Sequence, residues 1–209
     1  MAIYNIAAQI NTIYLSFSTA ISGVLLPRIT QMETNKATNQ DFTEFFIKVG
    51  RIQYIIMGLI ITGFVLVGKE FMIIWQGEEY LQSYYIACVL MLPVTVPLIQ
   101  NAGISILQAK NKHKFRTIVF SLIAILNVCI SIPLAKIYCG IGTAIGTAIS
   151  LIIGQIIIMN IYYYKKIHID IPRFWKEILK MTIPVVIAFI IGIGLNRILM
   201  ANNYFILLI

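Results

Sequence analysis

Hydrogen-bonding side chains recur at regular intervals along the first apolar segment of the chain. Asn5, Gln9, Thr12 and Ser16 follow one another at spacings of four, three and four residues. Residues three or four apart share one face of an α-helix, so these side chains predict a polar stripe on an otherwise apolar helix. Amides are costly in hydrocarbon. The stripe therefore indicates either contact with a neighbouring helix or the lining of a water-filled cavity, and the length of the run favours the cavity.

A second polar set accompanies two prolines. Gln100 and Asn101 fall on one broad face of a later apolar segment, together with Pro93 and Pro97. Each proline removes a backbone hydrogen bond and kinks a helix. Broken helices are common at transporter binding sites, and a bent packing helix is the alternative. The candidate substrate-binding residues are Asn5, Gln9, Thr12, Ser16, Gln100 and Asn101.

The reactive side chains form no recognisable catalytic or metal-binding set. Both histidines, His113 and His168, lie in basic segments, and the eight acidic residues lie in loops or at the ends of apolar blocks. Cys88, Cys129 and Cys139 include no CxxC pair, which gives little support to a disulfide or a metal site. The sequence predicts no metal, no cofactor and no enzyme activity.

Long apolar blocks make up most of the chain. Of its 209 residues, 59% are hydrophobic and 11% are charged, whereas a soluble domain carries about a quarter charged residues. A membrane-spanning helix needs roughly 20 apolar residues. The blocks therefore predict one all-α domain over residues 1–209, a polytopic membrane helix bundle with six full transmembrane helices and a truncated seventh. The expected spans are residues 3–26, 52–68, 84–107, 117–135, 140–161, 182–199 and 204–209.

Basic residues alternate between the connecting loops. The first, third and fifth loops hold thirteen of the sixteen Lys and Arg residues, and the net charge is +8. By the positive-inside rule these loops face the cytoplasm. Topology thus accounts for the charge, and no nucleic-acid partner is expected. Because this orientation places the N-terminus outside and the last block is incomplete, we expect a C-terminal portion of a larger transporter-like protein.

Two segments carry expectations about packing. Small residues recur every four positions and predict a ridge that another helix can approach closely, at Gly142, Gly146, Ser150 and Gly154. The segment DFTEFFIKVGR, residues 41–51, is amphipathic. It predicts a helix that is capped by Asp41 and lies on the cytoplasmic membrane surface.

Three parts of the chain resemble a known family. They are YNIAAQI with the following STAISGVLLPRIT, then GKEFMIIWQGEEY, and then ISILQAKNKHKFR. These segments resemble parts of the bacterial polysaccharide (O-antigen-type) flippases of the multidrug/oligosaccharidyl-lipid/polysaccharide exporter superfamily. The resemblance implies the C-terminal lobe of a two-lobed transporter in the bacterial plasma membrane, with a missing N-terminal lobe and a lipid-linked oligosaccharide as partners. It implies transfer of an undecaprenyl-diphosphate-linked repeat unit to the outer leaflet by alternating access.

The implied substrate sets a chemical requirement. Neutral Asn, Gln, Ser and Thr side chains suit sugar hydroxyls, whereas the diphosphate would need basic residues from elsewhere. Three alternatives stay open: a multidrug or cation antiporter of the same superfamily, an integral-membrane glycosyl or polymer transferase, and a structural membrane subunit. An antiporter usually needs an acid within the membrane and a transferase usually has large outer loops. The sequence predicts neither feature.

Overall fold

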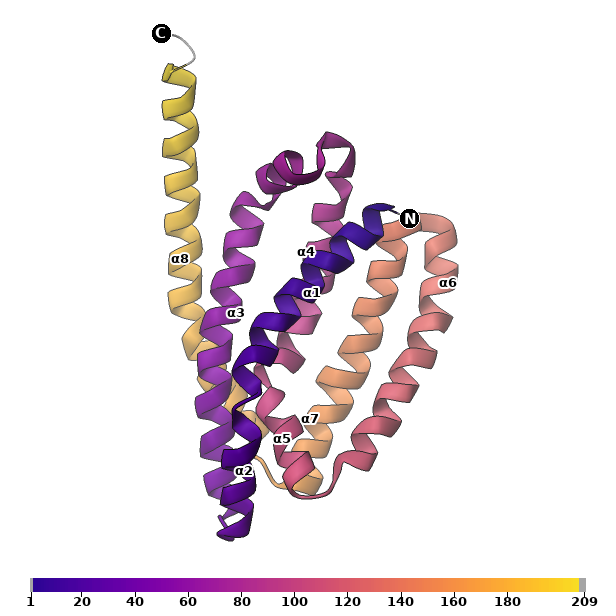
Figure 1. Cartoon of the computed structure of the whole chain (residues 1–209), viewed down its shortest axis with the longest axis vertical. Coiled ribbons are helices and arrows are strands. Elements are labelled where there is room, and N and C mark those ends of the chain that lie inside the picture. The colour runs from indigo at the N-terminus through magenta and orange to yellow at the C-terminus, as the bar shows by residue number, and fades with distance from the viewer. Residues whose placement is uncertain (1, 207–209) are drawn as a thin grey trace.

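The chain folds as a bundle of long helices (Figure 1), which confirms the all-α expectation. The computed structural model describes residues 2–206, with side chains up to residue 194 except that of His113. The α-helices are α1 (Ala2–Ser22), α2 (Leu25–Thr34), α3 (Asn39–Gln76), α4 (Gln82–Ile99), α5 (Asn101–Ala109), α6 (His113–Leu151), α7 (Met159–Tyr162) and α8 (Ile171–Ile206). A 3-10 helix covers Glu78–Tyr80, and π-helical segments cover Ile152–Ile158 and Tyr163–Ile167.

Five helical stretches are long and apolar enough to cross a membrane. One of them, Lys114–Ile167, has 54 residues and reverses direction at Cys139, where φ is 50° and ψ is −128°. Its two arms lie antiparallel (Figure 1) and are joined by a hydrogen bond of 3.2 Å from the Thr147 hydroxyl to Asn127 Oδ1. Counting both arms gives six apolar crossings among the described residues. The protein is therefore membrane-embedded, with the six full spans that the sequence predicts.

Two of the expected spans are divided, and a proline explains the first division. The first span breaks after Ser22, because Pro27 has no N–H for the Gly23 carbonyl and its ring clashes with that group. The third span breaks at Gln100, three residues after Pro97, and continues as α5.

The last two expected spans are one helix as far as it is described. α8 runs without a break from Ile171 to Ile206. The expected break between a span at residues 182–199 and a truncated seventh span at 204–209 is therefore not found among the described residues. Residues 200–203 read Met-Ala-Asn-Asn, and they contain no glycine or proline that would end a helix. Residues 207–209 lie outside the described residues.

The amphipathic segment 41–51 is the first part of α3, so the expectation of a separate surface helix is wrong. Phe42 and Phe46 are 1% and 0% exposed, because their apolar face packs against protein and not against lipid. The expected cap at Asp41 is also wrong: Thr38 is the N-cap, and Asp41 stands at the third helical position of a capping box. Thr38 donates its backbone N–H to Asp41 Oδ2 at 2.8 Å. The bond from the Thr38 hydroxyl lowers the pKa of the Asp41 carboxyl below its ordinary value.

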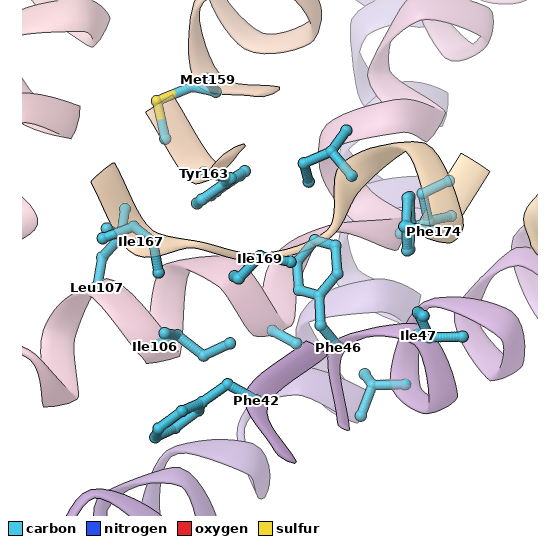
Figure 2. Packing of buried hydrophobic residues seen from close by; sticks show 14 of the residues in the cluster. Phe42, Phe46, Ile47, Ile106, Leu107, Met159, Tyr163, Ile167, Ile169 and Phe174 are labelled. Atoms are coloured by element: carbon cyan, nitrogen blue, oxygen red, sulfur yellow. The ribbon is translucent and has the colours of Figure 1, made fainter. Parts of the chain in front are cut away.

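The buried end of α3 joins an aromatic cluster (Figure 2). The Phe46 ring lies 4.7 Å from that of Phe174 and 5.9 Å from that of Tyr163, measured between centroids. Ile106 of α5 and Ile169 between the last two helices belong to the same cluster. It therefore holds together the helices that flank the first, third and fifth loops. We call this end of the bundle, where those three loops meet, the basic end.

Contacts between the loops confirm that the basic segments share one end of the bundle. Lys110 Nζ donates to Asn39 Oδ1 at 3.4 Å, and Lys112 Nζ donates to the Lys166 carbonyl at 3.3 Å. The small-residue ridge also contacts another helix as expected. A Cβ placed on Gly146 would lie 2.8 Å from Cα of Ser131 in the opposite arm of the hairpin.

Candidate functional site

Four of the six candidate residues lie on the outward face of α1. Asn5, Gln9, Thr12 and Ser16 are all exposed in the described chain. The opposite face of α1 packs mainly against α4. Its buried residues are Ala7, Ile10, Tyr14 and Ser18. The spacing in the sequence thus predicts the stripe correctly, and the structure leaves the stripe uncovered.

The polar groups of the stripe differ in how far they are satisfied. Thr12 donates to the Ala8 carbonyl at 2.9 Å, and Ser16 donates to the Ile13 carbonyl at 2.6 Å. The amides of Asn5 and Gln9 make no side-chain hydrogen bond within the described chain. An amide without a partner costs a few kcal/mol in an apolar medium. These two amides therefore require water, a ligand or another polypeptide next to α1.

Gln100 and Asn101 lie inside the bundle, so the structure does not bring the six candidates together. Gln100 is 2% exposed and donates from Nε2 to Asn160 Oδ1 at 2.8 Å. Asn101 is 9% exposed and donates from Nδ2 to the Ser18 hydroxyl at 2.8 Å. Both amides connect the break between α4 and α5 to neighbouring helices. In this arrangement they stabilise the fold, and they do not face the stripe.

Gln53 of α3 is a buried polar residue that belongs to the same network and was not among the predicted residues. It is 0% exposed and lies beside the carbonyls that the helix break leaves free. With the amide oriented so that its nitrogen faces these carbonyls, Nε2 donates to Leu98 at 2.8 Å and to Ile99 at 3.3 Å. In that orientation its oxygen accepts from the Ser22 hydroxyl at 2.8 Å. A glutamine at the start of an apolar block was the available signal in the sequence.

A charged groove opens at the basic end between α2, α3 and α8. Its volume is about 1210 Å³. Two ion pairs cross it, from Arg173 to Glu44 at 3.0 Å and from Arg51 to Glu177 at 3.8 Å. These pairs tie α3 to the first turns of α8, and they are mostly exposed, so each contributes little to stability.

Two cations of the groove have no carboxylate partner in the described chain. The Arg28 guanidinium lies over the Phe45 ring at 5.6 Å, and the Lys48 ammonium also lines the groove. Asp41, the remaining acid there, is occupied by Thr38. The groove can therefore hold an anion beside apolar groups such as Met32 and Ile55. The sequence predicts the sign of charge at this end, but it does not predict that these two cations stay unpaired.

The candidate site is thus defined by its geometry: an outward polar stripe on α1 and, at the basic end, a groove with two unpaired cations. Among the described residues, no group of three or more His, Cys, Asp or Glu side chains is placed to hold a metal ion. Comparisons of the chain with protein-family models, with curated proteins and with solved structures found no match.

Proposed function

We propose that the chain forms one lobe of a membrane transporter that moves a lipid-linked oligosaccharide from the cytoplasmic to the outer leaflet of a bacterial plasma membrane. The lipid would be a polyprenyl diphosphate such as undecaprenyl diphosphate. The observation that carries this proposal is the uncovered polar stripe of α1 on a membrane-embedded bundle. Polar groups at this depth are stable where they line a water-filled cavity. A second lobe that faces α1 across such a cavity would provide it.

The stripe matches the chemistry of a sugar. Asn and Gln side chains both donate and accept hydrogen bonds, as sugar hydroxyls do. From Asn5 to Ser16 the stripe extends for about 16 Å at 1.5 Å per residue, which is about half of the hydrocarbon thickness of a bilayer. A sugar that crosses this distance could exchange water for amide partners along the helix, so its desolvation is never complete.

The groove at the basic end suits the other part of the substrate. A diphosphate needs cations, and Arg28 and Lys48 are unpaired there. The apolar residues of the groove suit a hydrocarbon chain. In the orientation that the positive-inside rule predicts, the groove lies at the cytoplasmic leaflet, where a substrate made in the cytoplasm would arrive.

A double substitution on the stripe tests the proposal. Gln9→Leu combined with Thr12→Val, introduced at the chromosomal locus that encodes the chain, removes hydrogen-bonding groups and makes α1 more apolar. Insertion into the membrane should not suffer, because polar groups are the costly ones in a span. We expect surface polysaccharide to fall at least about ten-fold, because a loss of about 1.4 kcal/mol in substrate binding corresponds to a factor of ten. Membrane abundance of the protein, measured in parallel, should be unchanged.

Ser121→Val serves as the matched control. Ser121 is exposed on α6 and donates only to the Thr117 carbonyl of its own helix, so its loss should leave surface polysaccharide at the parental level. Parental polysaccharide in the double variant would overturn the proposal. Loss of polysaccharide together with loss of the protein would show that the stripe is a packing surface instead.

A further inference from the structure

A second pocket lies at the end of the bundle opposite the basic end, between α1, the start of α4 and both arms of the α6 hairpin. Its volume is about 780 Å³, which is within the usual range for sites that bind small molecules. Cys139, at the reversal of the hairpin, marks its rim, and Asn127 lies twelve residues earlier in the chain. At 1.5 Å per residue its lining therefore extends for about 18 Å along the first arm of the hairpin.

The pocket contains hydrogen-bonding groups without partners. The side chains of Asn5 and Gln82, which line it from α1 and α4, make no hydrogen bond within the described chain. Asn127 Oδ1 accepts from the Ser131 hydroxyl at 2.6 Å and from the Thr147 hydroxyl at 3.2 Å, while its Nδ2 donates to no described group. Three amides from three helices thus converge on one space. All three amides have free N–H donors, and the amides of Asn5 and Gln82 also have free oxygen acceptors.

The lining excludes a charged ligand and admits an amphiphilic one. None of the residues that line the pocket is acidic or basic, so nothing there compensates a phosphate or an ammonium group that leaves water. Between the amides the wall is apolar, with side chains such as Ile86, Val128 and Ile132. An uncharged headgroup rich in hydroxyls, attached to a hydrocarbon chain, satisfies both parts of this lining.

We propose that this pocket binds the uncharged sugar headgroup of a glycolipid at the leaflet opposite the basic end, with any phosphate of that lipid outside the pocket. The choice of a sugar rests on the proposed function, in which it is the site for the carbohydrate part of the substrate at the release side of the membrane. The charge difference between the two sites supports this division. The groove at the basic end holds unpaired cations, and the opposite pocket holds neutral amides alone.

Alkylation of Cys139 measures occupancy directly. The full chain, carrying Cys88→Ser and Cys129→Ser so that one thiol remains, is placed in phosphatidylcholine nanodiscs and treated with N-ethylmaleimide. Nanodiscs that also contain monogalactosyl diacylglycerol should slow the reaction. Because protection scales as 1 + [L]/Kd, we expect about five-fold slowing at a glycolipid concentration of about four times its Kd. Diacylglycerol, which lacks the sugar, and phosphatidylglycerol, which is anionic, should not slow it.

Two substitutions assign the effect to the pocket. Asn127→Leu should abolish protection. Gln82→Leu should also abolish it, and because Gln82 is exposed, this substitution does not disturb the hairpin. Gln9→Leu, on the stripe but outside the pocket, should keep full protection. Equal protection by diacylglycerol or by phosphatidylglycerol would overturn the proposal, as would no protection at all. The assay needs no transport, so absent protection with normal surface polysaccharide would remove this pocket and leave the proposed function intact.

Discussion

Replacing Gly146 with alanine should push the two arms of the α6 hairpin apart. The new Cβ would lie 2.8 Å from Cα and 2.9 Å from the backbone N of Ser131, whereas ordinary contact begins at 3.4 Å. The Ser131 hydroxyl oxygen is nearer still and could rotate, but Cα and N belong to the backbone and cannot rotate away. The helices must therefore separate by at least about 0.6 Å, a distance set by these two values. That movement also stretches the bond of 3.2 Å from Thr147 to Asn127.

A matched glycine isolates the steric part of the effect. Gly63 lies within α3, and a Cβ there would meet nothing within 4 Å. Gly→Ala raises helix propensity by up to about 1 kcal/mol at both sites, whereas overpacking typically costs about 1–3 kcal/mol. We expect Gly146→Ala to be less stable than Gly63→Ala by about 1–3 kcal/mol. Unfolding in detergent micelles with increasing dodecyl sulfate, followed by circular dichroism, measures the difference. Equal unfolding midpoints would refute the close packing of the hairpin.

Two further substitutions test buried positions. Gln53→Leu leaves the Ile99 carbonyl without its donor and should lower the free energy of unfolding by about 1–3 kcal/mol, measured by the same titration; an unchanged midpoint would show that another group satisfies the helix break. Phe46→Ala removes a ring that is 0% exposed and should cost about 3–5 kcal/mol, whereas Phe71→Ala, which removes a half-exposed ring of the same helix, should cost far less. Similar losses from the two phenylalanine variants would favour a surface helix at residues 41–51 after all.

The sequence alone predicts the features that depend on the geometry of a single helix. Apolar length predicts the spans, helical spacing predicts the polar stripe of α1, and the repeat of small residues predicts that another helix packs closely against residues 142–154. Each of these follows from the geometry of one helix. The reversal at Cys139 is also local, since a short segment between two apolar blocks leaves the second helix no direction except back along the first.

Features that depend on the partner of a surface were not predictable in the same way. The apolar face that contains Phe42 and Phe46 has the same periodicity whether it meets lipid or protein, so the sequence could not show that it packs under Phe174. The unpaired state of Arg28 and Lys48 depends on which acids the distant first turn of α8 brings to the groove. Pairing of Arg51 with Glu177 joins residues from different helices, and no local pattern encodes it.

The contrast between the two candidate polar sets has one physical cause. Where a helix breaks, carbonyls lose their intrahelical donors, and a membrane bundle must supply replacements from within. Gln53 donates to the carbonyls of Leu98 and Ile99, which the break at Gln100 leaves free, while Gln100 and Asn101 connect the same break to neighbouring helices. The segment from Asn5 to Ser16 lies within an unbroken helix, so no freed carbonyl requires its amides. Gln9 then has no hydrogen-bond partner inside the described bundle, and Asn5 only lines the pocket opposite the basic end, so both amides require a hydrated or polar environment next to α1.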